Sequence, residues 1–346
     1  MSDAITFPVF PDDCRSLLCK YLDKDVFEAL RDKITLNGFS LQQAINSGVV
    51  NPDSSIGVYA GDEASYATFA ALFDPIIAEY HGFHKGDFHR SNLNPDDLNA
   101  PELDPAHDYI LSTRIRVGRN LAGYPLGPAI PSEQRQQIET DVSHLLKNLK
   151  GELSGKYYSL ADIEDEDRER LIADHFLFKA GDRFLKAAGL NRDWPNGRGI
   201  FHNHAKTFLV WINEEDQLRI ISMQAGGDIK QVFSRLCDAV MQIGKQLEFA
   251  YNEHLGFISS CPTNLGTAMR ASVHIKLPKL AADMAQFKSI ADQYYLQIRG
   301  IHGEHSESEG GVYDISNRRR LGISEVDAVQ GLYDGVVALI AAEKLL

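Results

Sequence analysis

The chain has 346 residues, of which 44% are hydrophobic and 24% charged, a composition typical of soluble globular proteins and a length sufficient for two domains. Its 35 Lys and Arg residues against 48 Asp and Glu residues give a formal net charge of −13. This acidic balance argues against nucleic acid and membrane surfaces as partners, because proteins that bind either usually carry a basic field over a large area.

The N-terminal residues and the cysteines indicate the compartment. Residues 1–10 lack a basic start followed by a long apolar run, and no segment approaches the roughly 20 apolar residues that span a bilayer, so we expect a cytoplasmic protein. The four cysteines show no paired C-x-x-C spacing and are too few for a disulfide scaffold of this size, so we expect reduced thiols. They are Cys14, Cys19, Cys237 and Cys261.

The first third of the chain divides into a helical part and a linker. Within residues 26–34 and 64–80, apolar residues recur at helical spacing. Residues 82–107 are rich in Asn, Asp, Pro and His without an apolar period, which is typical of a linker that runs over the surface. We therefore predict a helical domain over 1–81, a linker over 82–107 and a second domain over 108–346.

The second domain is predicted to be α+β. Its helices are expected at residues 131–149, 228–247, 278–294 and 324–345. The second of these is the clearest, because Asp228 is a suitable N-cap and the following apolar residues fall on one helical face. Strands alternate with these helices, and hairpin-like connections favour a largely antiparallel sheet.

Several of the predicted strands carry arginine on one face. The strands are expected at residues 110–117, 207–212, 218–223, 270–277 and 295–299, with a hairpin turn at 213–216. Strict alternation in the first strand places Leu111 with Ile115 on the packed face and Arg114 and Arg116 on the other.

The arginines of these strands suggest a binding site for an anion. They are Arg114, Arg116, Arg219, Arg270 and Arg299. If the strands share one sheet, their guanidinium groups can converge on one surface, where they would suit a triphosphate. For any one strand taken alone, a solvated sheet face is the alternative.

Two further segments have both a functional and a structural interpretation. The chain contains neither a P-loop nor a G-x-G-x-x-G motif, so arginine would have to replace the usual phosphate cradle. The glycine-rich, acidic loop 300–311 could close over a ligand or could be an exposed loop. Residues 214–216 alone would be a solvated turn, and Cys261 alone would be a buried structural cysteine.

Five segments together resemble one family. They are CPTNLGTAMRASVHI at 261–275, NEED at 213–216, STRIRVGRN at 112–120, GDRF at 181–184 and GEH at 303–305. With the surrounding sequence they resemble the phosphagen kinases, most closely the arginine kinases, over nearly the whole chain. The resemblance implies an all-helical N-terminal domain and a C-terminal antiparallel sheet flanked by helices, the glutamine-synthetase-like catalytic fold. It also implies reversible transfer of the γ-phosphoryl group of Mg-ATP to a guanidino nitrogen, for ATP buffering.

The resemblance also assigns roles. It places the five arginines at the ATP or ADP phosphates, together with nucleotide contacts from Ser112, His175 and His274. Glu215 and Glu304 would hold the substrate guanidinium and accept a proton, which suits the chemistry because a protonated guanidinium is a poor nucleophile. Cys261 would lie beside the guanidinium as a positioning group with a stabilised thiolate. Mg²⁺ would bridge phosphate oxygens and waters without a direct protein ligand, and Glu214 is a possible water-mediated contact.

Substrate recognition is assigned to a short loop. By resemblance, the substrate's α-carboxylate and α-amino groups are bound mainly by the backbone of Ser54, Ser55, Ile56 and Gly57, with Tyr59. The short loop leaves room for a large guanidine, which implies free L-arginine rather than creatine or glycocyamine. Asp53 and Arg183 match a pair that links the two domains.

The sequence departs from the family pattern at two places. Ser55 stands where arginine kinases often carry glycine, which bears on substrate choice. His204 and Ala205 replace a common Asp-Asn pair beside the hairpin.

Alternative functions remain open at this stage. The guanidino substrate could instead be taurocyamine, lombricine or creatine. A protein-arginine kinase would resemble only the C-terminal domain, so the helical domain argues against it. A non-catalytic nucleotide-binding protein would not need Glu215, Glu304 and Cys261. A monomer and a homodimer are equally compatible with the sequence.

Overall fold

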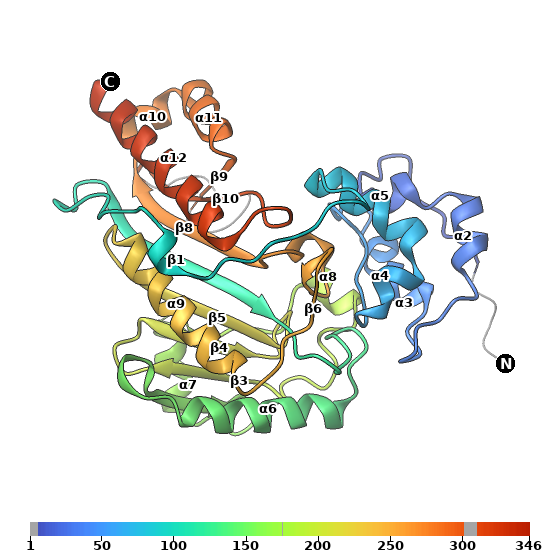
Figure 1. The fold of residues 1–346 in the computed structure, drawn as a ribbon. Coiled ribbons are helices and arrows are strands. Elements are labelled where there is room, and N and C mark those ends of the chain that lie inside the picture. Colours follow the sequence, from blue (N-terminus) through green and yellow to red (C-terminus); the bar gives the residue numbers. More distant parts are fainter. Residues whose placement is uncertain (1–5, 175, 301–309) are drawn as a thin grey trace.

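The computed structural model describes residues 6–174, 176–300 and 310–346 (Figure 1). Its N-terminal part is helical and packs around a buried cluster that includes Leu18, Phe27 and Phe73 and extends to Leu255 and Cys261 of the C-terminal part. The helices are α1 (Leu17–Tyr21), α2 (Lys24–Leu30), α3 (Leu41–Val50), α4 (Ala64–Thr68) and α5 (Ala70–His81). The expected helix at 64–80 is therefore two helices, because Phe69 leaves the helical conformation between them.

Residues 82–109 contain one 3-10 turn, η1 (Pro95–Asp97), and are otherwise without regular structure. The predicted linker is nevertheless anchored to the C-terminal part. Ser91 Oγ and the Asn92 backbone N–H donate to the buried carboxylate of Glu325, which lies 3.6 Å from the buried Arg119 guanidinium. These contacts fix where the helical part meets the sheet.

An eight-stranded sheet, antiparallel at every pairing, forms the centre of the molecule (Figure 1). Its order is β2 (Gly155–Ser159), β3 (Gly199–Asn203), β4 (Phe208–Ile212), β5 (Leu218–Ala225), β1 (Ile110–Arg119), β8 (Met269–Lys276), β10 (Val312–Asn317) and β9 (Leu296–Gly300). A separate two-stranded ribbon pairs β6 (Tyr251–Asn252) with β7 (Gly256–Phe257). The predicted α+β class is confirmed.

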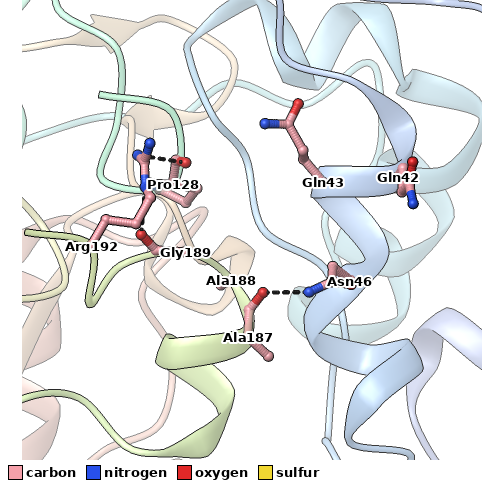
Figure 2. Close-up of a pocket in the computed structure, with 8 residues that line it drawn as sticks. All are labelled: Gln42, Gln43, Asn46, Pro128, Ala187, Ala188, Gly189 and Arg192. Carbon is pink, nitrogen blue, oxygen red and sulfur yellow. Dashed lines mark hydrogen bonds between the residues drawn. The ribbon is translucent and has the colours of Figure 1, made fainter. Parts of the chain in front are cut away.

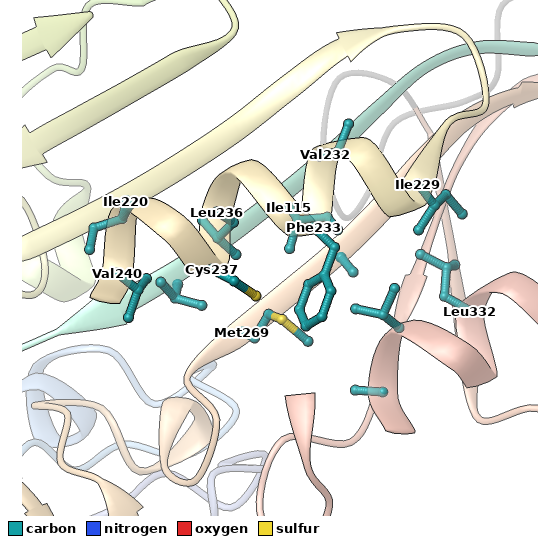
Figure 3. Close-up of a cluster of buried hydrophobic side chains, with 14 of the residues drawn as sticks. Ile115, Ile220, Ile229, Val232, Phe233, Leu236, Cys237, Val240, Met269 and Leu332 are labelled. Carbon is teal, nitrogen blue, oxygen red and sulfur yellow. The ribbon is translucent and has the colours of Figure 1, made fainter. Parts of the chain in front are cut away.

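Helices cover one face of this sheet. Figure 3 shows the apolar side of α9 (Ile229–Gly244) packed over Ile115, Ile220 and Met269 of three central strands. The remaining elements are α6 (Ser132–Lys147), η2 (Gly151–Leu153), α7 (Asp165–Ala173), α8 (Arg183–Ala187), α9 (Ile229–Gly244), η3 (Pro262–Asn264), α10 (Pro278–Ala282), α11 (Met284–Gln293) and α12 (Glu325–Leu345). None of the helices in the described ranges is long and apolar enough to cross a membrane.

The opposite face is only partly covered. A smaller apolar cluster, which includes Leu171 of α7 and Leu209 of β4, lies over the β2–β5 side of the sheet. Since side chains alternate along a strand, burying Ile115 and Val117 under the helices turns Arg114 and Arg116 to this second face. The alternation of β1 therefore places the arginines where a ligand can reach them.

The structure differs locally from the predictions. Leu111 is 51% exposed and Ile110 is buried, because a β-bulge between Ile110 and Ser112 reverses the alternation at the start of β1. Strands β2, β3 and β10 of the main sheet were not predicted. The expected helix at 278–294 breaks at Asp283, whose backbone is not helical and whose side chain caps α11 by accepting from the Gln286 N–H.

The expectation of four reduced thiols was also wrong. Cys14 and Cys19 form a disulfide across the start of α1, with Cα atoms 6.4 Å apart, whereas Cys237 and Cys261 are free and buried. Ser16, the N-cap of α1, accepts from the Cys19 N–H, and this turn brings the two sulfurs together. Sequence spacing alone does not reveal that proximity.

Candidate active site

Arginines from neighbouring strands meet at the centre of the uncovered face. Arg116 of β1 lies directly opposite Arg270 of β8 in the strand register. On the other side of β1, Arg219 of β5 lies opposite Gly118, two residues after Arg116. Arg114, Arg116 and Arg270 line one small cavity, while Arg116, Arg219 and Arg270 line a second. We call these the phosphate cavity and the reaction cavity. Arg299, on the edge strand β9, lines neither of them and pairs in register with Asp314 of β10.

Two arginines of this cluster, Arg114 and Arg116, are short of acceptors. The guanidinium groups of Arg114 and Arg116 donate no hydrogen bond to any part of the chain that the structure describes, and Arg114 Nε is buried. Burial, followed by the charges of Arg219 and Arg270, lowers the pKa of Arg114 to about 10. Burial and the same neighbours lower the pKa of Arg116 well below its ordinary value. A polyanion would relieve both effects, because it supplies acceptors and opposite charge together.

Glu215 lies at the turn of the β4–β5 hairpin and lines the reaction cavity. Asn213 closes this turn in a left-handed conformation (φ 56°) and anchors it by donating its side-chain N–H groups to the carbonyls of Arg135 and Gly197. Glu215 Oε2 accepts from Arg219 at 3.0 Å, and Glu214 Oε2 lies 2.9 Å from the same guanidinium nitrogen. The turn thus brings two carboxylates to one arginine.

The electrostatics of Glu215 suit a group that exchanges a proton. Burial raises the pKa of Glu215 to about 7, Arg219 opposes the rise, and the charges of Asp216 and Glu214 add to it. Asp216 is itself fixed by Ser259 Oγ at 2.9 Å and Asn120 Nδ2 at 2.8 Å. A carboxylate with a pKa close to neutrality can accept a proton during turnover, since it is matched to the working pH.

Cys261 lies in the buried cluster that also contains Tyr59 and Ile56 of the N-terminal part. Its Sγ is 3.1 Å from Thr263 Oγ1. Burial, followed by the charge of Glu215, raises the pKa of the Cys261 thiol to about 12. A stabilised thiolate therefore stays a prediction that depends on a bound guanidinium, because in the free chain the charge of Glu215 favours the neutral thiol.

The loop 54–59 approaches the reaction cavity from the helical part. Burial, followed by Cys261 and Glu215, raises the pKa of Tyr59, which shows how near the loop lies to both groups. Neighbouring segments donate to its carbonyls: Leu18 N–H donates to Ile56 O at 3.0 Å, and Gly48 N–H donates to Gly57 O at 3.0 Å.

In contrast to these carbonyls, three backbone N–H groups of the loop are unpaired within the described residues. Those of Ile56, Gly57 and Val58 have no hydrogen-bond partner within the described residues, although the loop is buried. Each buried N–H left unsatisfied costs about 1–3 kcal/mol. Three in succession point to a ligand that carries acceptor oxygens. Ser54 is buried in the same loop, whereas Ser55 is exposed.

A larger cavity of about 690 Å³ opens beside the phosphate cavity. Ser112 and His274, which pair in register on β1 and β8, line it together with the apolar side chains of Trp211 and Met223. Burial is the main cause that lowers the pKa of His274, whose Nε2 is 4.0 Å from Asp314 Oδ2. Such a cavity suits a flat, apolar group attached to phosphates.

Two predicted residues, His175 and Glu304, lie outside the described residues. Asp174 and Phe176, which flank the first of them, line the large cavity. Of the departures from the family pattern, Ala205 lines this cavity and His204 is exposed. The replacement of the common Asp-Asn pair therefore falls at the edge of this cavity.

The predicted link between the two parts is formed. Arg183 of α8 donates to Asp53 from both terminal nitrogens, with 2.9 Å from Nη1 to Oδ1. Beside it, Asn46 Nδ2 of α3 donates to Ala187 O at 2.7 Å, and Figure 2 shows this contact at a pocket between the two parts. Arg192 closes the other side of that pocket by donating to Pro128 O.

Sequence reasoning missed three polar residues of the site. Asn264 and Arg320 line the reaction cavity, and Asp314 lines the phosphate cavity, where it accepts from Arg270 Nη2 at 2.8 Å. Asp314 lies on the strand that was not predicted. Arg320 belongs to the run Arg318–Arg320 that follows this strand. Without a predicted strand before it, the sequence did not indicate the direction of the Arg320 side chain. The polar residue at position 264 was visible within the 261–275 motif but was given no role.

Comparison with known proteins identifies the class to which this fold and site belong. Residues 12–78 match the N-terminal domain, and residues 137–346 the C-terminal catalytic domain, of the ATP:guanido phosphotransferases. The chain belongs to this family, the phosphagen kinases, and is an ATP-dependent phosphotransferase.

Relatives of known name match along the whole chain. An arginine kinase of Plodia interpunctella is 54% identical over 96% of this chain and 94% of its own length. An arginine kinase of Anthopleura japonica is 57% identical over 95% of this chain, which spans only 47% of that relative. Among solved structures, a lombricine kinase has a TM-score of 0.93 at 39% identity, covering 98% of this chain and 94% of its own. The taurocyamine kinase of Schistosoma mansoni has a TM-score of 0.91 at 44% identity, covering 97% and 48%.

Proposed function

We propose that the protein is an arginine kinase, which reversibly transfers the γ-phosphoryl group of ATP to the guanidino group of L-arginine, giving phosphoarginine and ADP and so buffering ATP. The observation that carries the substrate proposal is the buried loop 56–58, whose three unpaired N–H groups suit the α-carboxylate of a free amino acid. The identity to arginine kinases of several animals supports the same choice.

The arginine cluster would provide most of the catalysis. The phosphoryl group in flight spreads its charge over three oxygens, so fixed cations and correct positioning lower the barrier. We assign the phosphates to Arg114 and Arg116, whose surroundings leave them short of acceptors, to Arg219 and Arg270 beside them, and to Arg299 from the edge strand β9. Adenosine would occupy the 690 Å³ cavity beside Ser112 and His274, with His175 assigned by resemblance alone.

The guanidinium would be held between carboxylates. Glu215 would hold two of its nitrogens in line with the γ-phosphorus and accept a proton as the new N–P bond forms. By resemblance, Glu304 would hold the guanidinium from the opposite side. Cys261 would border the guanidinium at the end of the substrate loop, where a bound cation would lower the raised pKa of its thiol.

Magnesium would accompany the nucleotide. Among the described residues no group of three or more His, Cys, Asp and Glu could hold a metal ion. We assign the cation to the phosphates and to water. The Glu214 carboxylate, beside Arg219 at the edge of the reaction cavity, is the group we assign to a water-mediated contact. Bound Mg²⁺ would neutralise part of the phosphate charge.

Further assignments complete the proposal. We propose a helical domain over 1–81, a linker over 82–107 and a catalytic domain over 108–346, and a cytoplasmic location where ATP and free arginine meet. Lombricine and taurocyamine are the competing substrates, because the solved structures of similar fold are named for them.

A side-by-side assay tests the substrate. Purified protein with Mg-ATP is given L-arginine, taurocyamine, lombricine or creatine, and acid-labile phosphate is measured. We expect L-arginine to be turned over fastest and creatine far more slowly. Equal or faster turnover of taurocyamine or lombricine would contradict the choice of arginine, and transfer to protein-bound arginine alone would contradict a free substrate.

A further inference from the structure

The Cys14–Cys19 disulfide lies beside the loop to which the substrate is assigned. Cys14 Sγ is 3.4 Å from the carbonyl oxygen of Pro52, 38 residues further along the chain. The bond closes a ring over residues 14–19, which includes the N-cap and the first turn of α1, and we call these residues the disulfide ring. Both of its cysteines are half-buried, so a small reagent can reach the bond, whereas Cys237 and Cys261 are buried.

The disulfide ring is attached to the substrate loop by backbone hydrogen bonds. Three N–H groups of the ring donate to carbonyls of residues 52–56: Arg15 to Pro52 at 3.4 Å, Leu17 to Ser55 at 3.1 Å and Leu18 to Ile56 at 3.0 Å. The two segments are also closely packed, because a Cβ added at Gly57 would lie 3.2 Å from Ser16 Oγ and 2.8 Å from Leu18 Cβ. The ring therefore fixes the carbonyl groups of the same loop whose N–H groups are unpaired.

The disulfide restrains a very short helix at its start. α1 has five residues, and a helix of this length is marginal without further restraint. Its end is held by Lys20, which pairs with Glu79 of α5. Its start carries the Ser16 cap, which accepts from the Cys19 N–H at 3.3 Å, and the disulfide. Cleaving the bond removes a restraint that lies directly beside the loop, since an open chain has more conformations than a closed ring.

We propose that the Cys14–Cys19 bond is a thiol–disulfide exchange site for a dithiol reductant, and that its reduction weakens binding of the amino-acid substrate at the loop 54–59. The effect on the substrate rests on the function proposed above. The cytoplasmic location proposed there supports a reversible bond, because disulfides in a reducing compartment are usually transient or redox-sensing.

The exchange consists of two displacements. A thiolate of the dithiol attacks one sulfur of the bond, forms a mixed disulfide and releases the other cysteine as a thiolate. The second thiolate of the reagent then displaces the remaining cysteine, so the reagent leaves as a cyclic disulfide. Two electrons pass to the chain, and the two cysteine thiolates take up the two protons that the dithiol has lost. Reoxidation is the reverse, with the cyclic disulfide as the electron acceptor.

Reduction should act on one substrate and not on the other. Among the described residues, those of the disulfide ring line none of the reaction, phosphate and large cavities. We therefore expect reduction to raise KM for L-arginine about fivefold or more, within the usual range for coupling between sites, and to leave KM for ATP unchanged.

The test compares the whole protein in two redox states. Wild type is purified without reductant, and free thiols are counted by alkylation and mass spectrometry before and after treatment with dithiothreitol. We expect two free thiols before treatment and four after it. Steady-state kinetics then give both Michaelis constants in each state. The control is Cys14→Ser/Cys19→Ser, which should match reduced wild type and show no response to dithiothreitol, because Cys237 and Cys261 are already free.

Hydrogen exchange gives a readout that requires no turnover. Reduction should speed exchange of the Leu17 and Leu18 N–H groups, which donate to the loop, and leave exchange within α9 unchanged. Four free thiols in untreated wild type, equal KM for L-arginine in both states, or a response of the double serine variant to dithiothreitol would overturn the proposal. If another guanidine proves to be the substrate, the exchange difference remains, and the two redox states are compared with that guanidine.

Discussion

Glu215 has an unusual position for a carboxylate, between one arginine and two further acids. Arg219 favours its charged form, whereas burial, Asp216 and Glu214 favour the protonated form, and the balance raises its pKa to about 7. We expect Glu215→Gln to lower kcat by about 100-fold or more, since it removes both charge and proton acceptor, and to leave Mg-ADP affinity nearly unchanged. Steady-state kinetics and nucleotide titration measure the two effects.

The pH profile tests the same group independently. Because Glu215 must be deprotonated to accept a proton, kcat/KM should rise with pH through about 7 in the wild type and lose that rise in the Gln variant. Conversely, near-normal turnover of the variant, or an unchanged profile, would remove Glu215 from the mechanism.

Arg116 illustrates a residue that serves binding at the expense of stability. It is surrounded by other arginines, and no hydrogen bond to the rest of the described chain compensates it. We expect Arg116→Met to raise the melting temperature of the free protein. We also expect the variant to show a smaller further rise with Mg-ADP, because a ligand that binds the folded protein more weakly stabilises it less. Thermal unfolding with and without Mg-ADP measures both.

The matched control is Arg235→Met in α9, a buried arginine with partners. Arg235 pairs with Glu152 and donates to Ser222 Oγ and Gln224 Oε1. Its loss should destabilise the free protein by about 1–3 kcal/mol, because the buried Ser222 hydroxyl loses its donor, and leave the Mg-ADP response intact. The prediction is contradicted if the Arg116→Met protein has a lower melting temperature than wild type and its response to Mg-ADP is intact. In that case the arginine cluster does not bind the nucleotide.

At the scale of elements, α1 and α3 determine the shape of the substrate loop. The chain of α3 passes so close that a Cβ at Gly48 would lie 2.5 Å from Gly57 O and 2.6 Å from Gly57 Cα. We expect Gly48→Ala to displace the loop and raise KM for L-arginine about tenfold or more, with little change in KM for ATP. A two-substrate kinetic analysis separates the two constants.

Gly331→Ala in α12 is the control, because its nearest atom would be 3.9 Å away and alanine favours a helix by about 1 kcal/mol over glycine. That variant should be slightly more stable and fully active. A rise of both Michaelis constants in the Gly48 variant would indicate general misfolding rather than a displaced loop.

The elements also show how far a sequence can be interpreted. Strands with clean alternation, such as β8, and helices with a clear cap, such as α9, were predicted closely because local pattern and burial agree. The bulge at Ile110–Ser112 was missed because it depends on pairing with β8, which is far away in sequence. Strand β10 was missed because it carries Asp and Ser on the cavity side, so its pattern is weakly apolar.

The same limit applies to the site. The arginines of β1, β5 and β8 were found because each lies in a predicted strand. Asp314 and Arg320 depend on β10 and on the turn after it, and the role of Asn264 depends on a contact with Glu215 across the fold. Local patterns therefore identified the groups that bear charge, whereas the groups that orient them required tertiary structure.

At the scale of the whole molecule, the site is assembled from two parts that must stay together. The helical part contributes the loop 54–59, the sheet contributes the arginines and Glu215, and the residues between them attach one to the other. Two histidines lie on this attachment. His81, half-buried, ends α5 with its Nε2 2.9 Å from Pro262 O. His89 of the linker is buried against Tyr251 and Glu253 of the C-terminal part, with both ring nitrogens unpartnered within the described chain.

Acid should therefore weaken the attachment. Burial lowers the pKa of His89 to about 4, and the charge of Arg119 adds to that effect. The folded form thus holds His89 neutral, while the unfolded chain binds a proton below its ordinary value of about 6.5. The stabilisation is complete above about pH 6.5 and is lost as the pH falls towards 4. We expect wild type to lose up to about 1.4 kcal/mol of unfolding free energy per pH unit in this window relative to His89→Leu.

Denaturant unfolding of both proteins at pH 7, 6 and 5 measures this difference. Leucine occupies the same apolar surroundings without buried unpaired nitrogens, so His89→Leu should be at least as stable as wild type at pH 7 and increasingly more stable below pH 6.5. Because wild type and His89→Leu are compared at the same pH, the contributions of buried acids such as Glu215 cancel. The raised pKa of Glu215 makes stability increase as the pH falls, which is the opposite direction. His204→Leu, at an exposed position, is the control and should follow the wild-type curve. Parallel curves for wild type and His89→Leu would show that the histidine stays neutral, or is equally protonated, in both states.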